Sequence, residues 1–362
     1  MANPLSRHWL FTTIAIEDDL GDQRGTGVLV AKTEVVRQKY GGLHSSWEAP
    51  ASHVYLVTAR HVLGANVSEI GATLHYGLRY NTIGGPHGIE RRKANFLVEN
   101  DPPNWAVHPD PRVDIACLDV TSWIASRPDG HFRYCPLSEV ANPLNMLEME
   151  CDAGDDIFVV GYPLRLRQGE SNLPIVRKGA LASTPRRSLV GEDGGRLRGF
   201  LIDGAIMPGT SGSPVISTST RFHPGDIGVT PHRLLLLGIV TQEWGRGITD
   251  RYNTTHSSAA SSPIEGYANL GLAHNAATIV ETIEQFGKLS VQDFQWIDHD
   301  LRWAAQLGIP EWAVEFDGSA VNPTTAFRIM NRLNRDRMRG EGMEVRHDDD
   351  FHDAPEIMGP VC

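Results

Sequence analysis

The sequence has few cysteines, no long apolar run and no excess of basic residues. Its four cysteines, Cys117, Cys135, Cys151 and Cys362, form no C-x-x-C pair, which argues against a zinc ribbon and against a disulfide-dense secreted scaffold. No stretch of 18 apolar residues occurs, and the short run "WLFTTIAI" is followed by acidic residues without an A-x-A-like cleavage site. We therefore predict neither a membrane span nor a signal peptide, and we expect a cytoplasmic protein.

The charge balance is acidic, with a formal net charge of −11 over 362 residues. A field of this sign does not favour binding to nucleic acid or to an anionic membrane. The hydrophobic content of 41% and the charged content of 21% are typical of a globular protein. The length allows one large domain with an appendage, or two domains of moderate size.

The first ~270 residues predict an all-β region, because short runs rich in Val, Ile and Leu are separated by turn residues. The candidate strands are 10–16, 25–32, 52–59, 114–120, 155–162, 199–206 and 233–242. Long loops at 36–50, 186–198 and 249–263 connect some of them. Short strands with long loops suit a barrel or sandwich whose loops carry the function.

The hydrophobic period then changes to that of helices. Residues 274–287 place apolar side chains at the i, i+3, i+4, i+7 spacing of an amphipathic helix, with Gly287 as a candidate C-cap. Residues 291–308 and 324–340 predict two more helices. We expect a domain over 8–287, a helical extension over 288–340 and a flexible acidic tail over 341–362.

Three polar residues follow or precede predicted strand ends in a suggestive order. His61 follows strand 52–59 in "VTARHV", Asp114 opens strand 114–120 in "VDIACL", and Ser211 lies in "GTSGSP". Each segment alone would more often be an ordinary strand end or turn. The order His, Asp, Ser, each beside a strand edge, favours a nucleophilic serine with a base and an orienting carboxylate.

These segments resemble the trypsin/chymotrypsin-like serine protease superfamily, in particular bacterial trypsin-like peptidase domains. "VTARHV" is similar to the T-A-x-H block of that family, "VDIACL" to its D-I-A block and "GTSGSP" to its G-x-S-G-G/S-P block, and the resemblance covers roughly residues 8–275. It implies a mainly β fold, a double six-stranded antiparallel β-barrel, followed here by a C-terminal helical extension. No PDZ-like module is apparent, which separates the chain from the high-temperature-requirement proteases.

The resemblance assigns roles to these residues. It implies a serine endopeptidase in which Ser211 is the nucleophile, His61 the general base and Asp114 the residue that orients His61. The backbone N–H groups of Gly209 and Ser211 would form the oxyanion hole. The reaction requires neither a metal nor a cofactor, and the partner would be a protein or peptide substrate.

The same resemblance points to four substrate-binding residues. Thr241 would fall where a hydroxyl contacts the catalytic aspartate, and Gln242 and Glu243 would line the substrate groove. Ala205 would lie near the base of the primary specificity pocket, where trypsin-like enzymes have an aspartate. A small or aliphatic residue before the scissile bond is the expectation from Ala205, whereas the charge of Glu243 argues against it.

Two alternative functions remain open. The chain could use a protease fold as a silent binding or scaffold module, or the C-terminal part could bind nucleic acid or a metal ion. Five arginines in helix 324–340 and the segment "HDDDFHD" carry the second alternative, but both features are more often a solvated face or tail. The C-terminal extension is also a candidate docking site for a regulatory protein.

Overall fold

The computed structural model of the chain describes the following residues: 9–33, 51–85, 88–141, 146, 151–185, 189–190, 196–204, 206–217, 234–243, 270–287, 344–345 and 357–358. The predicted loops 36–50 and 249–263 and the predicted helices 291–308 and 324–340 lie outside them. The domain boundaries stay a prediction.

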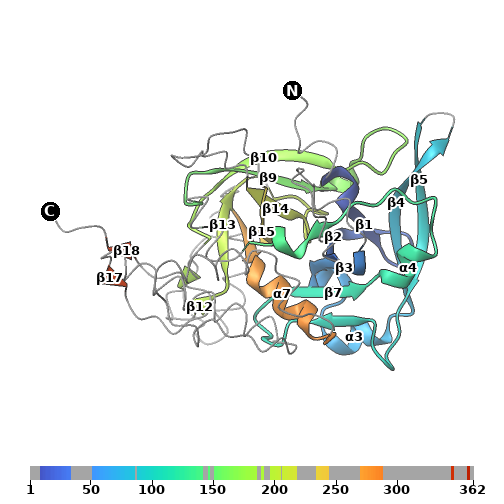
Figure 1. The fold of residues 1–362 in the computed structure, drawn as a ribbon, viewed down its shortest axis with the longest axis horizontal. Coiled ribbons are helices and arrows are strands. Elements are labelled where there is room, and N and C mark those ends of the chain that lie inside the picture. Colours follow the sequence, from blue (N-terminus) through green and yellow to red (C-terminus); the bar gives the residue numbers. More distant parts are fainter. Residues whose placement is uncertain are drawn as a thin grey trace, which may run out of the picture.

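The first half of the chain forms one antiparallel sheet with a short parallel addition (Figure 1). Its eight strands are β1 (Thr13–Glu17), β2 (Gln23–Thr33), β3 (Ala51–Ala59), β4 (His75–Gly85), β5 (Gly88–Leu97), β6 (Trp105–Val107), β7 (Ile115–Asp119) and β8 (Cys135–Pro136). They are ordered β5-β4-β1-β2-β3-β7-β6, and β8 pairs with β2. Short helices connect them: α2 (Arg60–Leu63), α3 (Val67–Ala72), α4 (Thr121–Ala125) and the 3-10 turn η2 (Leu137–Glu139).

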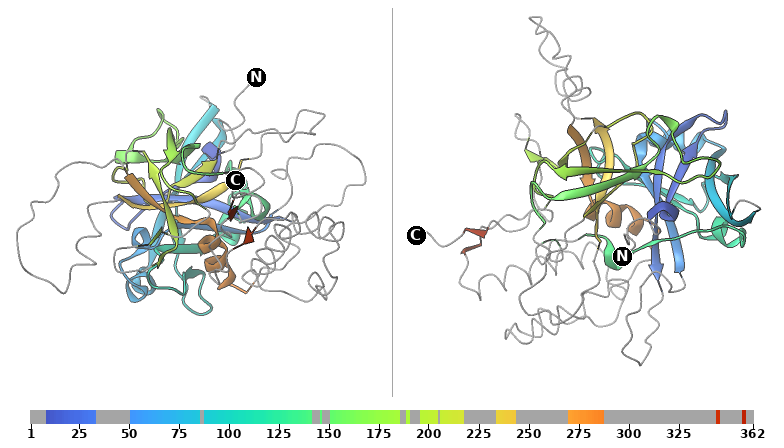
Figure 2. Two further views of the ribbon diagram at one scale, coloured as in Figure 1. Left: turned by 90° about the vertical axis from the view of Figure 1, so that its left-hand side faces the viewer. Right: turned by 90° about the horizontal axis from the view of Figure 1, so that it is seen from above.

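The second half closes into a six-stranded antiparallel barrel. Its strands are β9 (Asp156–Gly161), β10 (Ile175–Leu181), β13 (Gly199–Asp203), β14 (Pro214–Ser217), β15 (Leu236–Glu243) and β16 (Leu270–Asn275). The closed order is β10-β13-β16-β15-β14-β9, and Figure 2 shows this barrel beside the first sheet from two further directions. The remaining elements are the 3-10 turn η3 (Pro163–Arg165), the hairpin β11 (Leu189–Val190) and β12 (Arg196–Leu197), and the pair β17 (Glu344–Val345) and β18 (Ile357–Met358).

The central strands of the first sheet are buried on both faces. Along β2, Val28 and Val30 belong to a core shared with the second barrel, whereas Leu29 and Ala31 belong to the core of the first half. Strands β3 and β7 divide their residues in the same way. Because both faces are covered, successive positions must be apolar, which explains the unbroken apolar runs in the sequence.

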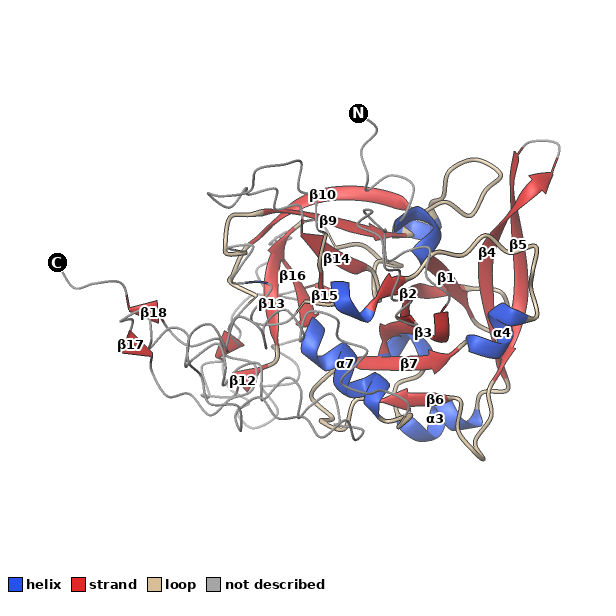
Figure 3. Ribbon diagram, viewed as in Figure 1, coloured by secondary structure: helices blue, strands red, loops and turns tan. Residues whose placement is uncertain are grey.

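One helix of the second half packs across both halves. Helix α7 (Ala276–Glu284) follows β16 and contacts β7 and β6 of the first sheet as well as β15 (Figure 3). Its buried side chains Ile279, Val280 and Ile283 join the shared core. The sequence predicted this helix two residues early, and Gly287 follows its end with a positive φ of 64°.

The predicted fold class is confirmed: a mainly β protein with a closed six-stranded barrel, a second sheet and a C-terminal helix. The first half differs in strand number, since eight strands pair there. All seven predicted strands correspond to observed ones, whereas the sequence analysis did not propose the β4–β5 hairpin, β10, β14 or β16. In the part of the chain that the structure describes, no helix is long and apolar enough to cross a membrane.

Candidate active site

Strand pairing brings His61 and Asp114 together. Strands β3 and β7 are antiparallel neighbours, and Ala59 at the end of β3 pairs with Ile115 at the start of β7. His61, two residues beyond Ala59, therefore lies beside Asp114, one residue before Ile115. The backbone amide of Arg60 fixes this corner by donating to the Asp114 carbonyl over 3.1 Å.

Both carboxylate oxygens of Asp114 accept hydrogen bonds from His61. The backbone amide of His61 donates to Oδ1 over 3.0 Å, and the ring nitrogen Nδ1 lies 2.6 Å from Oδ2. Because an ionised carboxylate can only accept, Nδ1 must carry the proton. In the neutral ring, Nε2 is then unprotonated and able to accept a proton. The His61 side chain is 43% exposed, so this nitrogen can reach a substrate.

Asp114 is held in its charged form. Burial alone would raise the pKa of this carboxyl, but the hydrogen bonds from His61, together with the positive charge that its ring carries when protonated, outweigh burial and bring the pKa below its usual value. An ionised Asp114 is what the Nδ1–H tautomer of His61 requires.

Ser211 lies in two successive tight turns. The amide of Thr210 donates to the Met207 carbonyl over 3.0 Å, and the amide of Ser213 donates to the Thr210 carbonyl over 2.9 Å. The third residue of each turn is a glycine with positive φ, 87° at Gly209 and 85° at Gly212. Glycine adopts this conformation without steric cost, which is why the sequence around the serine contains it.

The turn presses directly against the first sheet. A Cβ atom at Gly212 would overlap the carbonyl oxygen of Thr26 on β2 and the hydroxyl of Thr58 on β3. Thr26 also holds the turn by hydrogen bonds: its amide donates to the Ser211 carbonyl over 2.8 Å and its hydroxyl donates to the Gly209 carbonyl over 2.8 Å. The position of Ser211 is thus fixed relative to strands of the opposite half.

The same contacts bring Ser211 close to the segment that carries His61. A Cβ atom placed on Gly25 would lie 2.6 Å from a methyl carbon of Val62 and 2.8 Å from the Ser211 carbonyl oxygen, so both residues pack against Gly25. Among the described residues, however, the Ser211 hydroxyl bonds the Thr241 carbonyl over 3.4 Å and makes no hydrogen bond to His61. Such bonds are often long without substrate and tighten in the reactive complex.

The turn leaves two amides without an acceptor. The N–H groups of Thr210, Gly212 and Ser213 donate to backbone carbonyls. Within the described chain, the N–H groups of Gly209 and Ser211 have no such partner. Two unpaired donors, one on the serine itself and one two residues before it, provide what an oxyanion needs.

The segment after β9 packs against this turn and forms a hydrogen bond with it. The amide of Leu164 donates to the Pro208 carbonyl over 2.7 Å, and a Cβ atom at Gly209 would collide with the Tyr162 carbonyl oxygen. Leu164 and Arg165 both adopt positive φ, 52° and 62°. Non-glycine residues in this region are strained, and such strain persists where surrounding contacts enforce it.

The predicted substrate-binding residues are placed only in part. Thr241 is buried, and its hydroxyl lies 3.5 Å from the Leu272 carbonyl instead of contacting Asp114. Gln242 and Glu243 belong to β15, but their side chains lie outside the described residues, as does Ala205. The neighbours of Ala205 line a cavity of about 350 Å³ bounded by Val159, Arg177, Lys178, Gly179, Gly204, Ile206 and Met207.

The comparisons with known proteins decide the family. The trypsin-like peptidase domain family matches residues 25–222, more than half of the chain. The chain belongs to the trypsin-like peptidase family.

Similar solved structures include the inactive form of a serine-to-alanine mutant of Rv3671c from M. tuberculosis H37Rv (TM-score 0.40, 15% identity, covering 79% of this chain and 91% of that one). The HtrA-type protease AlgW with a decapeptide is also similar (TM-score 0.39, 14% identity, 79% and 67%). No curated protein sequence matches the chain. Family membership implies a peptidase, of serine type, with peptide or protein substrates.

Sequence reasoning missed two residues of this peptidase that hold the candidate site. Thr26 lies in "GTGVLV", a run that predicts a strand but carries no signal for the role of the threonine hydroxyl. His274 lies at the end of β16 and accepts the Asp114 amide over 3.0 Å. A lone histidine 160 residues from its partner carries no spacing signal, so only the three-dimensional structure reveals it. In the described ranges, no group of three potential metal ligands occurs.

Proposed function

We propose that this trypsin-like peptidase is a serine endopeptidase that uses Ser211, His61 and Asp114. The observation that carries the proposal is the pairing of His61 with Asp114 at the corner of the first half, beside a serine turn of the second half that has two amides without an acceptor. A silent scaffold would need neither the ionised carboxylate nor the free donors.

The chemistry follows from these atoms. The Ser211 hydroxyl turns from the Thr241 carbonyl toward the substrate, its oxygen bonds to the carbonyl carbon, and its proton passes to Nε2 of His61. The carbonyl oxygen becomes an oxyanion that accepts from the N–H groups of Gly209 and Ser211. Asp114 stabilises the imidazolium without taking its proton.

The intermediate then collapses in the direction of products. The carbon–nitrogen bond breaks, and His61 gives its proton to the departing amine. The acyl group stays on Ser211 as an ester. A water molecule, deprotonated by His61, attacks this ester, and the returning proton releases Ser211.

A fluorophosphonate probe tests the proposal, because it labels serines that a neighbouring base activates. We expect one adduct, mapped by peptide mass spectrometry to Ser211, together with cleavage of denatured casein. Ser211→Ala should abolish both.

Ser213→Ala is the matched control from the same turn. The Ser213 hydroxyl is fully buried and has no hydrogen-bond partner in the described structure, so its removal should leave labelling and cleavage intact. A folded wild-type protein that takes up no probe would identify the chain as a binding module instead.

A further inference from the structure

A second histidine contacts the candidate catalytic aspartate through its backbone instead of its carboxylate. His274, the fifth residue of β16, accepts the backbone amide of Asp114 at Nε2 over 3.0 Å. Its other ring nitrogen, Nδ1, lies 2.9 Å from the Arg198 carbonyl oxygen. The ring therefore connects the residue before β7 in one half with the residue before β13 in the other.

These two contacts fix the tautomer of His274. A backbone amide can only donate, so Nε2 must be unprotonated; a carbonyl can only accept, so Nδ1 must carry the proton. The ring is 2% exposed. Burial lowers its pKa from the usual 6.5 to about 4, which keeps it neutral at pH 7 and preserves Nε2 as an acceptor.

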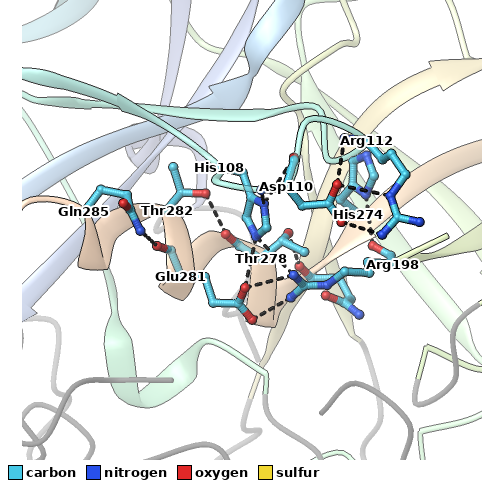
Figure 4. Close-up of polar contacts among 10 residues, drawn as sticks. His108, Asp110, Arg112, Arg198, His274, Thr278, Glu281, Thr282 and Gln285 are labelled. Atoms are coloured by element: carbon cyan, nitrogen blue, oxygen red, sulfur yellow. Dashed lines mark hydrogen bonds and ion pairs between the residues drawn. The ribbon is translucent and has the colours of Figure 1, made fainter. Parts of the chain in front are cut away.

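Arg198 also anchors the other end of the segment that carries Asp114. Its guanidinium forms a two-pronged ion pair with Glu281 of α7, at 2.9 and 2.5 Å. The same carboxylate lies 3.0 Å from Nε2 of His108, whose Nδ1 accepts the Asp110 amide over 3.0 Å (Figure 4). His108 is 2% exposed.

Residues 108–114 are thus held at both ends by the second half. His108 is bound through Glu281 at the start, and Asp114 is bound through His274 at the end. Arg198 takes part in both contacts, by its side chain at one end and its carbonyl at the other.

We propose that His274 is a positioning residue for the reaction: it holds Asp114 in register with His61 across the interface of the two halves. The proposal rests on the proposed function of Ser211, His61 and Asp114. His274 touches neither substrate nor reacting atoms, and it acts through the backbone of Asp114. A displacement of Asp114 would misalign Nδ1 of His61, and errors near 1 Å in a reactive geometry cost on the order of 100-fold in rate.

Two substitutions separate the two bonds of the ring. In His274→Gln, the side-chain oxygen reaches the place of Nε2 and can accept the Asp114 amide, while the bond to Arg198 is lost. In His274→Asn, the side-chain nitrogen replaces Nδ1 and can donate to the Arg198 carbonyl, while the bond to Asp114 is lost. The pair is matched in polarity, so thermal stability can be compared directly.

We expect His274→Asn to lower kcat for a peptide substrate by on the order of 10- to 100-fold with KM within about twofold. His274→Gln should retain kcat within about threefold. Equal kcat values in both variants, whether both wild-type or both reduced in proportion to lost thermal stability, would overturn the positioning role.

A nitrogen NMR measurement decides the same point without activity. At pH 7, His274 should show an unprotonated Nε2 and a protonated Nδ1, and the downfield Nδ1 proton of His61 should persist in His274→Gln but shift or vanish in His274→Asn. A protonated Nε2, or an unchanged His61 proton in both variants, would refute the proposal. Because the readout needs no turnover, failure of the proposed protease activity would be recognised separately, by an inactive wild-type protein.

Discussion

Two histidines bond Asp114, and their surroundings differ. Both carry the proton on Nδ1, His61 facing the Asp114 carboxylate and His274 facing the Arg198 carbonyl. The Nε2 of His61 lies on a side chain that is 43% exposed, whereas the Nε2 of His274 is occupied by a backbone amide in a ring that is 2% exposed.

The difference shows how the surroundings of a histidine suit it to one of two roles. Burial lowers the pKa of His274, and both of its ring nitrogens are hydrogen-bonded, so the ring stays neutral near pH 7, which suits a structural contact. Exposure leaves Nε2 of His61 open to a substrate, which suits a general base. Substitution of His61 should therefore lower activity, whereas substitution of the buried Glu281, which pairs with Arg198, should mainly lower stability.

The largest effect is expected from His61→Ala. Removal of the base should lower kcat for a fluorogenic peptide on the order of 10⁶-fold, as loss of a base in a triad does. The free energy of unfolding in urea should fall by less than in Glu281→Gln, because the His61 side chain is 43% exposed and the His61 backbone amide still donates to Asp114. Retention of more than a tenth of the activity would remove His61 from its assigned role.

Asp114→Asn should have the next largest effect. The amide side chain can donate to Nδ1 of His61 and so favours the wrong tautomer, which lowers kcat on the order of 10⁴-fold. The backbone amide that His274 accepts is unchanged by the substitution. Pre-steady-state kinetics should show acylation slowed by that factor; an unchanged acylation rate would contradict the account.

Glu281→Gln should lower stability more than activity, because it removes one partner of the buried ion pair with Arg198. It leaves the Arg198 charge without its carboxylate, and loss of one partner from a buried pair costs about 3–5 kcal/mol. We expect kcat within tenfold of wild type, measured at a temperature where the variant is folded.

The control is an ion pair with a similar contact distance on the surface. Lys178 lies 2.6 Å from Asp156, and both side chains are more than half exposed. Lys178→Ala should cost less than about 1 kcal/mol. Equal losses in the two variants would show that the Arg198–Glu281 pair is not special.

The last prediction concerns the dependence of stability on pH. The folded-state pKa of His274 is about 4, against 6.5 for a free side chain, so the unfolded chain binds one more proton between these values. Stability should fall by about 3 kcal/mol as the pH drops from 6.5 to 4. Asp114, His108 and Arg198 are the charged or titratable groups that act on this ring.

His274→Gln supplies the comparison for that titration. Urea unfolding at half-unit pH steps should show a flatter profile in this window for the variant than for the wild-type protein. Below pH 4, the variant and the wild-type protein should both lose further stability. The pKa of Asp114 is lower in the folded state than in the unfolded chain, so protonation of this carboxylate favours unfolding. Identical slopes from pH 6.5 to 4 would mean that His274 titrates normally.

The sequence predicted the parts of the fold that carry a local signal. Strands β2, β3 and β7 are buried on both faces, so their apolar runs are unbroken and easily recognised. The β4–β5 hairpin has charged and polar residues within both strands, as in "GIERRKANFL", and was not proposed as a strand pair.

The site divides in the same way. His61, Asp114 and Ser211 lie in short segments with a recognisable pattern, and strand register explains why two of them meet. Thr26, Arg198 and His274 act through hydrogen bonds to residues distant in sequence. Such contacts depend on how the two halves pack, for which one sequence contains no periodic signal.

The most direct measurement of the central claim is the pre-steady-state reaction with a p-nitrophenyl ester. The account predicts a burst of nitrophenol approaching one equivalent per enzyme, with a stoichiometric acyl adduct on Ser211 in acid-quenched samples, because acylation and deacylation are separate steps. Linear release from time zero, with no adduct on Ser211 at any quench time, would contradict it.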